Sequence, residues 1–134
     1  MRAFLDANVL FSASRTGSNI GRLVRLLTER GTAVASDLAV EEARRNIVLK
    51  RPDWLATFEE LLRTVEIVPS AQFPLPVALA AKDVPLLCAA IRSRCRYFVT
   101  GDKRDFGHLQ GRRVEGVEIV SLLALAKALS GRQR

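Results

Sequence analysis

Residues Tyr97 to Phe106 read YFVTGDKRDF, an apolar run that stops at Thr100 and Gly101 and continues into two aspartates three residues apart. An apolar run of this length that ends at a glycine predicts a buried strand followed by a turn. Asp102 and Asp105 therefore follow the carboxyl end of a strand, which is where open parallel sheets bind their ligands. The stretch predicts both a parallel sheet and an acidic site at its edge.

Strands and helices are expected to alternate along the whole chain. Short apolar runs predict the strands, and apolar residues at helical spacing predict the helices between them. A Ser/Thr/Gly loop is expected after the first strand, and a proline-containing loop after the third. The expected strands are 2–5, 32–35, 65–68, 97–100 and 117–120, and the expected helices are 19–30, 37–49, one opening at 52–53, one opening at 82–83, a short turn or helix after the fourth strand, and 121–129.

This alternation predicts an α/β domain in which right-handed crossovers build a parallel sheet covered by helices on both faces. A length of 134 residues suits one domain, 1–134. No apolar run approaches the roughly 18 residues of a membrane span, and no signal peptide is apparent, so a cytoplasmic protein with no membrane partner is expected. Cys88 and Cys95 are expected to be reduced thiols.

The chain is strongly basic, with 21 Lys and Arg residues against 14 acids and a formal charge of +7. Most of the positive charge is arginine, whose planar group suits phosphate recognition. Two interpretations of the charge remain open: a polyanionic partner, or a solvated surface without a specific partner.

Four acids are expected to converge on one crevice. Asp6 follows the first strand, Asp102 follows the fourth, Asp83 opens the helix between the third and fourth strands, and Glu42 lies one and a half turns into the second helix. Each alone is explained as well by a cap, a turn or a solvated helix position. Together they would repel one another unless cations were bound, and oxygen ligands without His or Cys select Mg²⁺ or Mn²⁺.

Four segments, FLDANVLFSA, SDLAVEEARRNI, KDVPLLCAAI and YFVTGDKRDF, resemble the signature blocks of the PIN-domain nucleases in order and spacing. The resemblance covers nearly the whole chain. It is strongest to the stand-alone PIN toxins of type II toxin–antitoxin systems, the VapC-like proteins. It implies a three-layer α/β/α sandwich with a central parallel sheet, and RNA cleavage that depends on Mg²⁺ or Mn²⁺.

The resemblance also implies roles for individual residues. The first block has Ala7 where the family commonly has Thr or Ser. Glu42 is preferred to its neighbour Glu41 because it falls six residues after Ser36, as in the family's block. The implied catalytic and metal-binding acids are Asp6, Glu42, Asp83 and Asp102, with Asp105 as an additional metal ligand and with Asn8 and Thr100 bracing the pocket through hydrogen bonds.

A cationic rim around the acidic pocket would account for the charge balance, because the RNA backbone is polyanionic. The candidates for this rim are Lys103, Arg104 and Arg15. His108, the only histidine, is expected on the surface and has no partner in any nucleophile motif.

The function implied by the resemblance is a metal-dependent endoribonuclease that acts as a toxin. Toxins of this kind are neutralised by an antitoxin and are often dimeric, so an antitoxin and a homodimer are the implied protein partners. A housekeeping RNA-processing nuclease and a non-catalytic RNA-binding or scaffold module remain alternatives. A phosphotransferase of the haloacid dehalogenase type is disfavoured, because it needs a second Asp where Asn8 stands.

Overall fold

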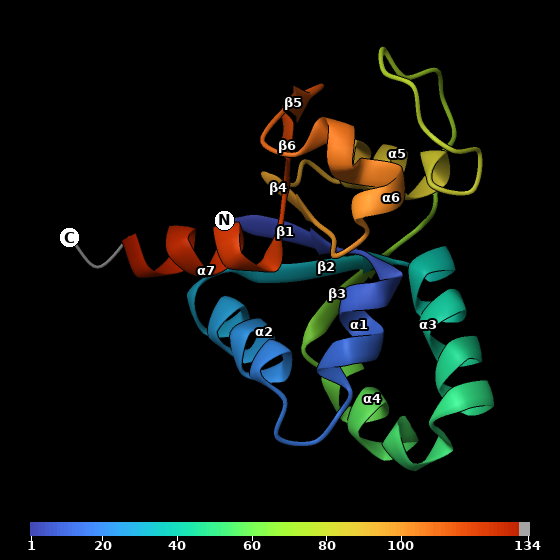
Figure 1. Ribbon diagram of the computed structural model, residues 1–134, viewed down its shortest axis with the longest axis vertical. Helices are drawn as coiled ribbons and strands as arrows, with labels where there is room; N and C mark the ends of the chain where they lie inside the picture. The colour runs from blue at the N-terminus through green and yellow to red at the C-terminus, as the bar shows by residue number, and fades with distance from the viewer. Residues whose placement is uncertain (132–134) are drawn as a thin grey trace.

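The computed structural model describes residues 1–131 as alternating strands and helices (Figure 1). In chain order the elements are β1 (Arg2–Leu5), α1 (Ala7–Ala13), α2 (Asn19–Arg30), β2 (Thr32–Ser36), α3 (Asp37–Lys50), the 3-10 turn η1 (Pro52–Trp54), α4 (Leu55–Leu62), β3 (Val65–Val68), α5 (Val84–Arg92), β4 (Tyr97–Val99), α6 (Lys103–Phe106), the 3-10 turn η2 (Gly107–Leu109), β5 (Arg113–Val114), β6 (Val117–Val120) and α7 (Leu122–Gly131).

The six strands form one sheet in the order β3-β2-β1-β4-β6-β5. Every neighbouring pair is parallel except β5 with β6, which is antiparallel. In Figure 1, α5 and α6 lie on one side of the sheet, whereas α1, α2, α4 and α7 lie on the other. The predicted three-layer α/β/α sandwich with a central parallel sheet is confirmed, and β5 is its one antiparallel strand among the described residues.

The central strands are apolar because both of their faces are covered. Residues 3–5 of β1, 33–35 of β2 and 97–99 of β4 are all buried, as expected for strands of a parallel sheet. The ring of Phe98 in β4 stacks against Phe4 of β1 at 5.2 Å and against Phe106 of α6 at 4.9 Å between centroids. These aromatic contacts fix α6 against the centre of the sheet.

Two elements were not predicted. Helix α1 occupies the start of the region expected to be a loop, and the side chain of Asp6 caps it by accepting a hydrogen bond from the backbone N–H of Ala7. Strand β5 turns back onto β6 through Glu115 and Gly116, whose φ angles of 50° and 89° are those of a two-residue hairpin. The ends of the predicted strands differ from those observed by at most one residue.

The direction of winding reverses between β1 and β4. From β1 the chain adds β2 and β3 on one side, and then it crosses to add β4 and β6 on the other. Open α/β sheets bind ligands at such a reversal, beyond the carboxyl ends of the strands, and we call the region beyond the ends of β1 and β4 the crevice. The predicted edge for the site is therefore the switch point of the sheet.

The loop between β3 and α5 leads into this crevice and projects from the domain in Figure 1. Two hydrogen bonds tie it down: Cys88 Sγ donates to the carbonyl of Phe73 at 3.3 Å, and His108 Nε2 pairs with the carbonyl of Ala78 at 2.9 Å. His108 is exposed, and Cys88 and Cys95 are buried and form no disulfide. Within residues 1–131 no helix has the length and apolar character needed to cross a membrane.

Replacing Phe98 with Ala is expected to lower the free energy of unfolding by about 3–5 kcal/mol, because it removes the ring that packs between Phe4 and Phe106. The change can be measured by denaturant unfolding. Leu123→Ala on α7, at a side chain that is 66% exposed, is the control and is expected to stay within about 0.5 kcal/mol of the wild type. Equal losses for the two variants would contradict this account of the core.

Candidate metal site at the switch point

Asp6 is fixed at the end of β1 by three hydrogen bonds. Its Oδ1 accepts from the backbone N–H of Ala7 at 2.8 Å, and its Oδ2 accepts from Thr100 Oγ1 at 2.7 Å and from Asn8 Nδ2 at 3.1 Å. The residue is only 4% exposed. Burial raises the pKa of Asp6, and the charges of Glu42 and Asp102 add to the rise, whereas the hydrogen bonds from Thr100 and Ala7 lower it.

The side chains of Asn8 and Thr100 connect the β1 end to the turn after β4. Asn8 Oδ1 accepts from the N–H of Gly101 at 3.0 Å, and Thr100 Oγ1 accepts from the N–H of Asp102 at 3.0 Å. Thr100 thus donates to the carboxylate of Asp6 and holds Asp102 through its backbone. This network fixes two acids from distant parts of the chain on one crevice.

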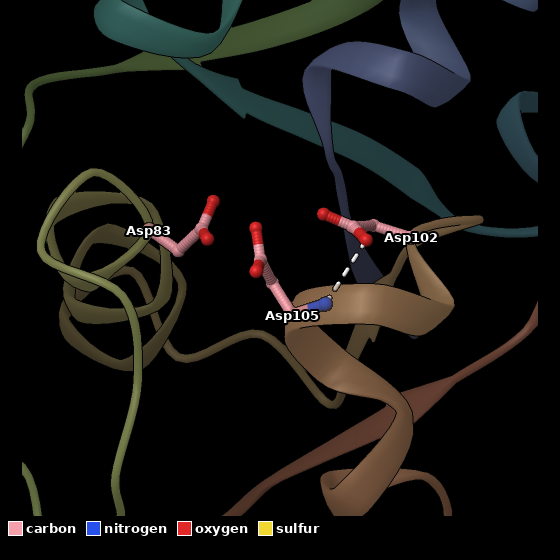
Figure 2. Close-up of side chains that lie close together, drawn as sticks. All are labelled: Asp83, Asp102 and Asp105. Atoms are coloured by element: carbon pink, nitrogen blue, oxygen red, sulfur yellow. Dashed lines mark hydrogen bonds between the residues drawn. The ribbon is translucent and has the colours of Figure 1, made fainter.

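Asp102 caps α6, because its Oδ1 accepts the N–H groups of Arg104 and Asp105 at 3.0 and 3.1 Å. The cap uses one carboxylate oxygen. It also sets the direction of α6, so that the Asp105 side chain lies between those of Asp83 and Asp102 (Figure 2). One oxygen from each of Asp83, Asp102 and Asp105 lies within 4.8 Å of the other two.

Asp83 is the acid that has a buried oxygen without a hydrogen bond among the described residues. It stands immediately before α5 and is 5% exposed, and its Oδ2 is buried with no hydrogen bond from any described residue. Burial raises the pKa of Asp83 to about 7, and the nearby Asp105 and Asp6 carboxylates add to the rise, whereas Lys82 opposes it. Figure 2 shows its carboxylate pointing toward Asp105 and Asp102.

Lys82 is a member of the cluster that the sequence did not identify as functional. Its Nζ lies 3.1 Å from Asp105 Oδ2 and 3.9 Å from Asp83 Oδ2, although 69% of its side chain is exposed. The hydrogen bond that Lys82 donates to Asp105 and the charge of Asp83 raise the pKa of Lys82, and the same hydrogen bond lowers the pKa of Asp105. The only sequence feature that pointed to Lys82 was its position next to a predicted metal ligand, Asp83.

Glu42 lies on the exposed surface of α3 and reaches the cluster through its charge, which raises the pKa of Asp6. It is not among the three acids whose oxygens lie within 4.8 Å of one another. The adjacent Glu41 pairs instead with Arg45 at 3.8 Å on the same helix. Of the two glutamates, Glu42 is therefore the one whose charge acts on the crevice.

The predicted cationic rim is only partly assembled. Lys103 and Arg104 are exposed on α6, directly beside Asp102 and Asp105. Arg15 does not join them, because it follows α1, and a helix of seven residues carries the chain about 10 Å away from Asp6. It lines a separate hollow with Trp54 and the start of α2.

The acids fit the divalent cation that the resemblance implies. A buried carboxylate oxygen without a hydrogen bond is unfavourable when the group is charged, and a bound cation removes this cost. The donors are all carboxylates, which suit hard ions such as Mg²⁺ and Mn²⁺. The residues placed to hold the ion are Asp83, Asp102 and Asp105, with Asp6 fixed beside them.

No protein-family model and no curated protein matches the sequence. Solved structures match the fold, among them these three. A chain in VapBC2 from Rickettsia felis, bound to a DNA fragment from its promoter, has a TM-score of 0.67 and 13% identity over 90% of this chain and 98% of that one. A chain of FitAB bound to a DNA fragment has a TM-score of 0.59 and 18% identity, covering 90% and 94%. A PilT N-terminus domain protein from Sulfolobus solfataricus has a TM-score of 0.57 and 17% identity, over 96% of this chain and 93% of that one.

The chain has a VapC-like PIN fold. At identities of 13–18% the match concerns the backbone fold alone.

Asp83→Asn is expected to raise the melting temperature in EDTA at pH 8. The pKa of Asp83 is raised in the folded protein to about 7, so folding is favoured when the group is protonated, and this stabilisation is lost as the pH rises from about 4 through 7. The asparagine does not titrate. The gain in melting temperature should therefore be large at pH 8 and shrink toward pH 5.

Asp53→Asn is the matched control, since Asp53 is exposed and its hydrogen bond from Arg51 lowers its pKa. This variant is expected to leave the melting temperature unchanged or slightly lower at pH 8. A lower melting temperature for Asp83→Asn at pH 8, or a difference that does not change with pH, would contradict the assignment of Asp83 as an uncompensated acid.

Proposed function

We propose that the protein is a metal-dependent ribonuclease that hydrolyses RNA phosphodiester bonds. The observation that carries the proposal is the buried Oδ2 of Asp83, which has no hydrogen bond among the described residues and faces Asp102 and Asp105. A non-catalytic RNA-binding or scaffold module would not require a buried carboxylate oxygen without a hydrogen bond. The haloacid dehalogenase alternative also loses support, because three hydrogen bonds hold Asp6 and only 4% of it is exposed.

The bound Mg²⁺ or Mn²⁺ would lower the pKa of a coordinated water and stabilise negative charge on the attacking and leaving oxygens of the phosphodiester. The protein's part is to present the ligands without rearrangement. Thr100 fixes Asp6, the start of α6 fixes Asp102, and the end of the loop before α5 presents Asp83. Glu42 adds negative charge that acts on Asp6.

A covalent mechanism has little support among the described residues. The hydroxyl of Thr100 is buried and donates its proton to Asp6, so it is a brace and not a nucleophile. Cys88 and Cys95 are buried, and Cys88 Sγ donates to the carbonyl of Phe73. Direct attack by water therefore agrees best with the residues that line the crevice.

RNA is proposed as the substrate because the acidic crevice lies beside exposed cations in a chain of charge +7. Phosphate contacts from Lys103 and Arg104 on α6 would bring a backbone past Asp102 and Asp105. Arg15 would contact RNA only if the strand continued along α1 to its far end.

Within this activity we favour the role of a toxin in a toxin–antitoxin pair. The matches to chains in the VapBC2 and FitAB complexes support this choice, because the PIN fold there occurs in two-component assemblies bound to DNA. The proposed partners are RNA, a cognate antitoxin and a second copy of the chain. A housekeeping RNA-processing nuclease would use the same acids, and cleavage mapping in cells separates the two roles.

Purified protein is expected to cleave single-stranded RNA with Mg²⁺ or Mn²⁺, and EDTA is expected to abolish the cleavage. Asp102→Asn should lose roughly a hundredfold or more in rate and much of the metal affinity. Asp105→Asn should lose less of both, since Lys82 already engages its Oδ2. Cleavage that persists in EDTA, or a larger loss of metal affinity for Asp105→Asn, would contradict these assignments.

RNA binding is expected to weaken steeply with salt if Arg104 contacts phosphate, and Arg104→Ala should flatten the slope of log K against log salt by about one unit. Arg15→Ala, at the far end of α1, is the comparison and should leave the slope unchanged. Filter binding or fluorescence anisotropy in EDTA gives both slopes without cleavage. A change for Arg15→Ala alone would place the RNA on the other side of the molecule.

A further inference from the structure

The ammonium group of Lys82 lies among the acids of the proposed metal site. It is 3.1 Å from Asp105 Oδ2, within hydrogen-bond distance, and 3.9 Å from Asp83 Oδ2, beyond it. A turn places it there, because the N–H of Asp83 donates to the carbonyl of Ala80 at 2.9 Å just before α5. Asp105 thus accepts a hydrogen bond from the ammonium group, whereas the buried Oδ2 of Asp83 has only a longer ion pair with it and no hydrogen bond.

The Lys82 ammonium group and a divalent ion in the pocket would compete for the same oxygens. A divalent ion bound by Asp105 Oδ2 would have to displace the Lys82 ammonium from its hydrogen bond, and the two positive charges would repel one another at that distance. At Asp83 Oδ2 no hydrogen bond has to be broken, because the ammonium group lies 3.9 Å away. The arrangement therefore divides the cluster into an occupied half and an open half.

We infer that Lys82 takes the place of a second divalent ion, so that the pocket holds one ion at Asp83 and Asp102 while the ammonium neutralises Asp105. The inference rests on the proposed function only in requiring that the pocket binds a divalent ion. It makes Lys82 a positioning residue, which acts through Asp105 and limits how many ions the acids bind. It also gives Asp105 its secondary role, since this carboxylate is held by the protein itself.

Removal of the charge at this position should open the second half of the pocket. Isothermal titration with Mn²⁺ is expected to give one ion per wild-type chain and two per chain for Lys82→Met, which keeps most of the side-chain length. Lys82→Arg keeps the charge and should retain one ion. Lys127→Met, at an exposed lysine on α7, is the matched control and should also retain one.

Thermal unfolding supplies a second readout that does not depend on activity. In EDTA, Lys82→Met should have a lower melting temperature than the wild type, because the acids lose a neutralising charge. Saturating Mn²⁺ should then raise the melting temperature of Lys82→Met by more than it raises that of the wild type. An ion pair with a purely structural role would move the melting temperature and leave the number of bound ions unchanged.

The outcomes separate this inference from the proposed function. One Mn²⁺ per chain in both the wild type and Lys82→Met, or two in the wild type, would overturn the inference and leave the metal-dependent activity standing. A wild-type protein that binds no Mn²⁺ would overturn the proposed function and the inference together.

Discussion

The hydrogen bond of 2.7 Å from Thr100 Oγ1 to Asp6 Oδ2 joins the ends of the two central strands. β1 and β4 are neighbours in the sheet although most of the chain lies between them, and the winding reverses between them. Since the same hydroxyl accepts the N–H of Asp102, one side chain aligns both strand ends and starts α6. The position of Asp102 therefore depends on Thr100, together with the hydrogen bond from the N–H of Gly101 to Asn8.

The fold treats the acids of the crevice unequally. Asp6 accepts three hydrogen bonds and Asp105 accepts one from Lys82, whereas Asp83 Oδ2 is buried without a hydrogen bond among the described residues. A buried acceptor left without a hydrogen bond lowers stability by about 1–3 kcal/mol. A fold optimised only for its own stability would not keep such an oxygen, so a cation is the most direct physical reason for Asp83. The surplus of arginine outside the crevice then suits a polyanionic substrate.

The strands and the acids at their ends could be predicted because apolar runs, and the residues that follow them, are local features of the sequence. Helix α1 could not, since its seven residues are too few to show a helical period, and this omission also brought Arg15 into the expected rim. The contact of Lys82 with Asp105 depends on how a loop and α6 come together, which residue spacing does not encode. Which oxygen lacks a partner, as at Asp83, is likewise a property of the packed structure.

The most direct test of the account is a crystal structure of the protein with Mn²⁺, in which anomalous scattering locates the ion. The account predicts a manganese peak bonded to Asp83 Oδ2 and to Asp102, with Asp6 and Asn8 keeping their hydrogen bonds to Thr100 and Gly101. A crevice that stays free of manganese at saturating concentration, or an ion bound only to acids outside it, would contradict the claim that these carboxylates are assembled for a metal.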